Sequence, residues 1–358
     1  MPTEERMKAQ LSLPIFRDCV HKWQAPCTNG VRYWFRSDSI FRMRLKVISI
    51  AVAALMLFSA NIANACEFCK DDGTAARKQV PWDKIEFHAR KLVISASSLM
   101  EWSILDTEAS GVEWVEPDDV AGVEGTPIEP GKDILRIAYN SDFLGTHYYT
   151  VLWVDPKTGA ILQYETSKDG RKAKHRVYRF TNMGVFQRTW RPEADEKKLD
   201  WHQWTDQSGD YRPFQHEAQD QIIVDTLSLV YLVTTSDLGR GVNRQDYLAY
   251  GDREISRAVF SAAERADVKA DFYIQGPGGE QRCRGKFNVL KIDLDIQQVG
   301  DIIDPDFGFL TEIELYITPD TRLPVILSGR AEGLGNLVIK AKQVFTSEAI
   351  TCPEPITN

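Results

Sequence analysis

The stretch 311–345 alternates apolar and polar side chains so regularly that it limits the fold of the chain more than any other feature. Apolar side chains recur at every second position, with polar ones between them: Ile313, Leu315 and Ile317 against Glu312, Glu314, Tyr316 and Thr318. A period of two is that of a β-strand. Pro319 ends the strand because proline has no N–H for the ladder, and Leu337, Ile339 and Ala341 repeat the pattern further on. The stretch predicts a β-meander with one apolar face and one face toward water.

Short turns predict antiparallel strands on both sides of a single helix. The strands expected before the helix are 134–140, 148–154, 160–166, 176–180 and 185–190; those after it are 247–251, 254–262, 268–275 and 284–296. Connections as short as 155–159 join neighbouring strands antiparallel. Apolar residues at helical spacing predict the helix near 221–238, capped by Asp220 or Asp225 and ended by Gly239. We expect a mainly β fold, a curved antiparallel sheet or barrel-like meander with one packed helix.

Residues 1–65 differ from this globular part. Residues 43–46 are basic, 47–60 are apolar and uncharged, and Ala63 and Ala65 supply the small residues of a cleavage site. This is the pattern of a signal peptide over 43–65, and the apolar run is shorter than the roughly 20 residues of a transmembrane helix. Residues 1–42 precede a suitable start methionine and are predicted to be a non-native extension. We expect export to the periplasm.

The exported part divides into residues 66–132, with strands within 85–105 and a loop rich in Asp, Glu, Gly and Pro from 106, and an antiparallel β domain over 133–350. Residues 1–65 carry nine of the 43 basic and four of the 51 acidic side chains, so the processed chain has a net charge of −13. An acidic chain is a poor partner for nucleic acid, or for anionic lipid surfaces bound by charge alone.

Four cysteines remain after processing: Cys66, Cys69, Cys283 and Cys352. In an oxidising compartment they predict two disulfides, with three possible connectivities, two of which tie the start of the exported chain, at Cys66 or Cys69, to Cys352. A redox role for the C-x-x-C at Cys66, a zinc site with Cys283 and Cys352, and lipid attachment at Cys66 are alternatives. Lipid attachment is less expected because Ala63 stands where lipoproteins carry leucine.

Motifs that would identify a reaction are missing from the sequence. The histidines of the exported part, at 88, 147, 175, 202 and 216, form no H-x-x-x-H pair. Residues 276–279 have no Lys-Ser/Thr after them and are predicted to form a hairpin turn rather than a phosphate loop. The acidic residues within 293–306 do not match a calcium-binding loop. We assign no catalytic residue, no metal ligand and no cofactor.

Aromatic residues concentrate in the one long interruption between the two series of strands. The candidate ligand-binding residues are Trp190, Trp201, His202, Trp204, Tyr211 and Phe214. If this loop covers the mouth of a barrel, its rings line an apolar entrance. If it packs beneath the helix, the same rings are ordinary core.

Three stretches of the chain resemble domain of unknown function 3108, a bacterial family. They are 177–180 (VYRF), 225–232 (DTLSLVYL) and 313–325 (IELYITPDTRLPV), and the likeness extends from Asp133 to Phe345. The resemblance implies a secreted, antiparallel, barrel-like fold without an established activity. It therefore supplies no catalytic residues.

The sequence favours a non-catalytic exported protein that binds an apolar or amphipathic ligand, such as a lipid or hydrophobic small molecule, or an envelope protein. One alternative is a periplasmic hydrolase, which would need His202 or His216 beside an acidic residue in a cleft. A second is a structural envelope module, which would carry an exposed apolar patch. No nucleic-acid partner is expected.

Overall fold

The computed structural model describes residues 80–91, 94–117, 122–143, 146–170, 172–251, 254–299, 310–331 and 335–356. The predicted extension 1–42, the signal peptide 43–65, Cys66 and Cys69 lie outside these ranges. The described residues belong to one compact unit, Asp71–Asn358. The expected division at 132/133 falls inside this unit.

The described strands form one sheet of fifteen strands. The first eight are β1 (Lys84–Lys91), β2 (Ile94–Asp106), β3 (Asp133–Phe143), β4 (Thr146–Val154), β5 (Ile161–Lys168), β6 (Lys174–Phe180), β7 (Gly184–Arg191) and β8 (Asp206–Pro213). The others are β9 (Ile223–Asp225), β10 (Arg244–Gly251), β11 (Glu254–Gly276), β12 (Gly279–Gln298), β13 (Leu310–Ile317), β14 (Pro324–Ala331) and β15 (Gly335–Phe345). The described helical segments are η2 (Glu196–Lys198), η3 (Trp201–Gln203), η4 (His216–Ala218), η5 (Thr226–Ser228) and α2 (Leu229–Thr235).

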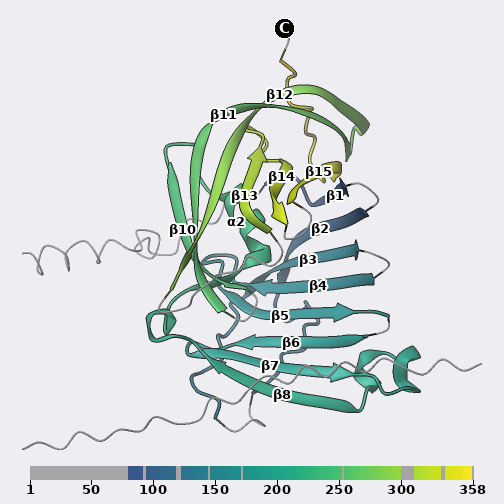
Figure 1. The fold of residues 1–358 in the computed structure, drawn as a ribbon, viewed down its shortest axis with the longest axis vertical. Coiled ribbons are helices and arrows are strands. Elements are labelled where there is room, and N and C mark those ends of the chain that lie inside the picture. The colour runs from purple at the N-terminus through teal and green to yellow at the C-terminus, as the bar shows by residue number, and fades with distance from the viewer. Residues whose placement is uncertain are drawn as a thin grey trace, which may run out of the picture. The chain divides into compact units, whose positions relative to one another are not determined.

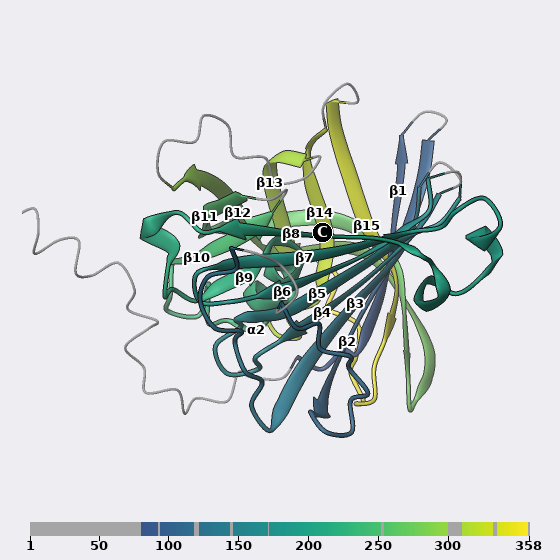
Figure 2. The same ribbon diagram turned by 90° about the horizontal axis from the view of Figure 1, so that it is seen from below.

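The order of strands in the sheet is β8 to β1 in reverse sequence, then β15 back to β9. Figure 1 shows β2 to β8 stacked one after another in blue and teal, with the green and yellow strands above them. Seen from below, β2 to β8 are rotated progressively relative to one another (Figure 2). This is the twist expected of a large sheet. An added pairing of β15 with β11 closes β11 to β15 into a five-stranded barrel. The predicted mainly β, barrel-like fold with one packed helix is confirmed.

A bulge in β11 makes this closure possible. The strand is 23 residues long, and its pairing with β12 shifts between Ala262 and Arg265. A bulge bends a strand, so the first part of β11 pairs with β10 while Tyr273–Gln275 reaches Gln343–Phe345 of β15 in parallel. The two strands expected at 254–262 and 268–275 are one bent strand.

The alternation in 311–345 has the predicted effect. Ile313, Leu315 and Ile317 are buried, and Glu312 is exposed. Ala341 in β15 is buried while Lys340 and Lys342 beside it are exposed.

Both faces of the sheet β3 to β7 are covered over part of their area. One face, here the inner face, packs on β9, η5, α2 and β10, and its apolar residues join the largest core cluster, among them Leu135, Ile137, Leu152, Phe180 and Val185. The other, the outer face, is covered by the acidic segment after β2. There Val115 donates its N–H to Gln163 Oε1 at 3.0 Å, and Trp114 lies 4.8 Å from the Arg179 guanidinium.

The helix is shorter than the predicted 221–238. Ile223–Asp225 pairs in parallel with Leu248–Tyr250 as β9, and Asp225 accepts a hydrogen bond from Leu227 N at 2.8 Å, which begins the helical turn η5. Only Leu229–Thr235 is α-helical. Among the described residues no helix is long and apolar enough to cross a membrane.

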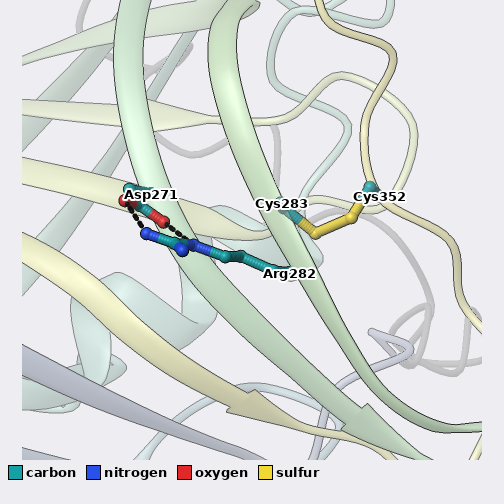
Figure 3. The surroundings of a disulfide bond; sticks show 4 residues. All are labelled: Asp271, Arg282, Cys283 and Cys352. Atoms are coloured by element: carbon teal, nitrogen blue, oxygen red, sulfur yellow. Dashed lines mark hydrogen bonds and ion pairs between the residues drawn. A yellow bond between two sulfur atoms is a disulfide. The ribbon is translucent and has the colours of Figure 1, made fainter.

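Cys283 and Cys352 form a disulfide, with Asp271 and Arg282 close by (Figure 3). The bond holds the C-terminal segment along β12, where Ile356 N also donates to the Lys286 carbonyl at 2.7 Å. Cys352 is therefore not tied to the start of the chain, and this pair does not bind zinc as thiolates. The options that linked Cys352 to an N-terminal cysteine were wrong.

Candidate functional site

Five of the six aromatic candidates gather on the outer face. Trp190 and Trp204 are buried there with Val177 and Phe186, and Trp201 and Tyr211 pack against them. His202 stacks on Trp201. Phe214 belongs to the inner core instead. The five rings on the outer face therefore lie neither at the barrel nor beneath the helix.

Trp201 is stacked between two histidines. The ring centroids of His175 and Trp201 are 3.7 Å apart, and those of Trp201 and His202 are 3.6 Å apart. His175 Nδ1 lies 2.7 Å from Ser167 Oγ, and its Nε2 is buried without a hydrogen-bond partner among the described residues. Burial lowers the pKa of His175 to about 4, so this imidazole is neutral at pH 7.

The acidic groups of this cluster contact the other histidine. His202 Nδ1 is hydrogen-bonded to Asp200, and its Nε2 lies 3.6 Å from Glu113. The His202 side chain is 55% exposed. A hydrolase of the Ser-His-Asp type links its nucleophile, base and acid in one chain of hydrogen bonds, whereas here Ser167 contacts His175 and Asp200 contacts His202. The histidine–carboxylate pair that the hydrolase alternative requires is present in His202 and Asp200, but both side chains are exposed and Ser167 contacts His175 instead.

Within the described ranges no three His, Cys, Asp or Glu side chains are grouped so that they could hold a metal ion. Of the acidic residues at 293–306, Asp293 pairs with Lys291 at 3.0 Å, and 301–306 lies outside the described ranges.

The inner face carries a row of polar side chains where an antiparallel sheet usually has core. One residue from each of five strands lies side by side in register: Tyr139, Thr150, Thr166, Arg176 and Thr189. We call these five residues the polar row. Thr150 and Thr189 are buried, and Arg176 is half-buried.

Next to the polar row, toward the core, lie Tyr164, Tyr178 and Gln187, again in register. Tyr164 and Tyr178 stack with centroids 4.9 Å apart. Tyr250 from β10 approaches Tyr178 to 6.4 Å. The face thus changes from apolar beneath α2 to aromatic and then to polar.

Two polar atoms at this boundary are buried without hydrogen-bond partners among the described residues, Arg176 Nε and Gln187 Oε1. Another polar atom of each side chain is engaged: Gln187 Nε2 donates to Thr189 Oγ1 at 2.8 Å, and Arg176 Nη1 lies 3.5 Å from Tyr178 Oη. An unpaired buried polar group costs about 1–3 kcal/mol. Such a cost is expected where a ligand supplies the missing partner.

Basic residues lie beyond Arg176 on the same face, whereas Asp210 of β8 lies directly opposite Gln187. Lys168 and Lys174 are directly opposite each other on β5 and β6, and Arg176 follows on the same face two residues later. Like charges directly opposite in a sheet are destabilising. An anion bound beside these side chains would interact favourably with all three cationic groups.

Asp225 lies where β9 and η5 meet the inner face. It is 3% exposed, and burial raises the pKa of its carboxyl to about 7. Tyr139 Oη donates to the Leu227 carbonyl, in the turn that Asp225 caps. Burial and the nearby Asp225 raise the pKa of both Tyr139 and Tyr164 well above its usual range.

Comparison of the chain with family models, with curated proteins and with solved structures found no match. The resemblance to domain of unknown function 3108 thus stays a prediction. Sequence reasoning missed Arg176 and Gln187 as site residues and used Asp225 only as a helix cap. The available signal was the position of Arg176 and Gln187 on the same face of their strands as Tyr178.

Proposed function

We propose that this protein is an exported, non-catalytic binding protein that takes an anionic amphiphile on the inner face of β3 to β7. The polar end of the ligand lies at Arg176 and Gln187, and its apolar part lies along the rings of Tyr139, Tyr148 and Tyr164. The observation that carries the proposal is the pair of buried atoms Arg176 Nε and Gln187 Oε1, which have no hydrogen-bond partner in the described part of the chain.

The charge of the ligand follows from the side chains around these atoms. Lys168, Lys174 and Arg176 share one face, and Arg pairs well with carboxylate or phosphate because its planar fork donates two parallel hydrogen bonds. Gln187 Oε1 accepts, so the head group also carries an O–H or N–H donor. The net charge of the whole chain opposes anion binding at long range, and this local cluster overcomes it at contact distance.

The amphipathic character follows from the order of side chains across the face. Tyr148 and Tyr139 are partly exposed there, and Lys168 Nζ lies 5.3 Å from the Tyr148 ring. Flat aromatic surface next to cationic groups suits a ligand that has an apolar part joined to an anionic head.

Native mass spectrometry of the protein, isolated in the form in which cells accumulate it, tests the proposal. We expect a copurifying anionic amphiphile, lost from Arg176→Met and retained by Lys172→Met, an exposed lysine of the same hairpin that changes net charge equally. The same spectrum tests export, since cleavage after residue 65 predicts a chain that begins at Cys66. Copurification that is equal in both variants would exclude the site.

A further inference from the structure

Among the strands that the structure describes, the two at the edges of the sheet differ in character. Its terminal strands are β8 and β9. All three residues of β9 are buried, whereas Asp206 to Asp210 of β8 are exposed in succession. An exposed edge strand offers its free N–H and C=O groups to another strand.

The backbone groups of β8 that point away from the sheet can be identified. Phe214 N donates to the Met183 carbonyl at 2.7 Å, and β7 and β8 pair with Val185 opposite Arg212 and Gln187 opposite Asp210. Hydrogen-bonded pairs alternate along an antiparallel ladder, so the even-numbered residues 206–212 bond to β7. The N–H and C=O groups of Gln207, Gly209 and Tyr211 therefore face outward.

We propose that β8 pairs with β8 of a second copy of this chain, antiparallel, about a two-fold axis at Gly209. In this register Gln207 lies opposite Tyr211 of the other copy, and Gly209 opposite Gly209, so every outward-facing residue meets another. A two-fold axis makes both halves of the contact identical and closes the assembly. Gly209 has no side chain to separate the strands at the centre.

Charge favours a second copy over other strands. The register places Asp206 opposite Arg212 of the partner twice, and directly opposite charges of unlike sign stabilise a sheet. The ion pairs that these two residues make within one copy are compatible with the new pairing. Asp206 lies 3.9 Å from Arg191, and Arg212 bonds Asp210 at 3.1 Å on its own strand. In-register parallel pairing would instead set like charges side by side.

Sedimentation velocity over a range of protein concentrations tests the pairing on the protein as cells accumulate it. A seven-residue contact buries little area, so we expect a dimer that grows with concentration. Asp206→Arg and Arg212→Asp should each weaken association about tenfold or more, because each reversal creates two like-charge pairs. An equimolar mixture of the two variants should form a heterodimer as strong as the wild-type dimer, since both contacts are then complementary.

Gly209→Pro tests the backbone contact. It removes an outward N–H and no bond to β7, so the fold should persist, as checked by circular dichroism, while the dimer is lost. A protein that stays monomeric at all concentrations would overturn the proposal. So would a dimer that survives Gly209→Pro, or variants whose mixture does not associate.

Discussion

Arg322 Nη2 lies 2.8 Å from the carbonyl oxygen of Val233, and this contact connects the barrel to the helix over the inner face. The same guanidinium donates to the carbonyls of Thr234, Ser236 and Leu238. The carbonyls of Val233, Thr234 and Ser236 belong to the last turn and the C-cap of α2, where carbonyls lack helical partners, and a cation there also favours the helix dipole. Arg322 is 4% exposed and has a φ of 54°, so the turn after β13 adopts a left-handed conformation to place it.

Arg322→Met should lower the free energy of unfolding by about 3 kcal/mol or more, because several buried carbonyls lose their charged donor at once. Arg240→Met is the matched control. Arg240 is exposed and donates in the reverse direction, to the carbonyls of Pro319 and Asp320. We expect its replacement to cost under about 1 kcal/mol. Equal losses in urea unfolding would contradict the role given to Arg322.

Asp225 should make the protein less stable as pH rises. Its carboxyl has an ordinary pKa of 3.8 in the unfolded chain and about 7 in the fold. Between these values the unfolded chain loses its proton first, so stability falls from pH 4 to pH 7, by up to about 1.4 kcal/mol per pH unit. Asp225→Asn keeps a helix-capping side chain and should remove this slope. The measurement is the difference between wild type and variant in urea unfolding at pH 5 and pH 8.

His175 should make the protein less stable as pH falls, the opposite of the effect of Asp225. Its ordinary pKa is 6.5, and burial lowers the pKa to about 4 in the fold. The stability from keeping it neutral is present above pH 6.5 and is lost as pH falls toward 4. His175→Phe keeps a ring beside Trp201 and should unfold at a lower pH than wild type. An unchanged acid midpoint would show that the buried imidazole does not limit acid stability.

The disulfide should stabilise the folded protein because it closes a long loop of the chain. Cys283 and Cys352 are 69 residues apart, and closing a loop of this length stabilises by about 4 kcal/mol in the chain-entropy description. Cys283→Ala with Cys352→Ala should therefore lower the urea midpoint strongly, and dithiothreitol should destabilise wild type but leave the variant unchanged. A loss below about 1 kcal/mol would show that the C-terminal segment is held by its other contacts.

Local patterns predicted the strands well, because alternation and turn residues act within a few positions. A period of two was enough to predict that Ile313, Leu315 and Ile317 share the buried face of their strand. The closure of the barrel was not predictable in this way, since it depends on a bulge near Ala262 and a parallel contact between Tyr273 and Gln343. Such contacts join residues far apart in sequence.

The site was harder to predict than the fold. The aromatic insertion is visible in the sequence, but whether its rings face outward or inward depends on which side of β6 and β7 the loop crosses. Arg176 and Gln187 are separated by a turn, and only the pairing of β6 with β7 brings them onto one face. The predicted helix was too long because Ile223–Asp225 finds a partner strand in β10, a tertiary effect that overrides helical spacing.

Calorimetric titration with dodecyl phosphate, below its micelle concentration and after lipid extraction, tests anionic amphiphile binding on the inner face most directly. Dodecyl maltoside, which has the same chain and no charge, is the control ligand. We predict that the phosphate binds more tightly than the maltoside, and that Arg176→Met weakens phosphate binding about tenfold or more while Lys172→Met does not. Equal binding of both ligands, or an Arg176→Met affinity equal to that of wild type, would contradict the proposal.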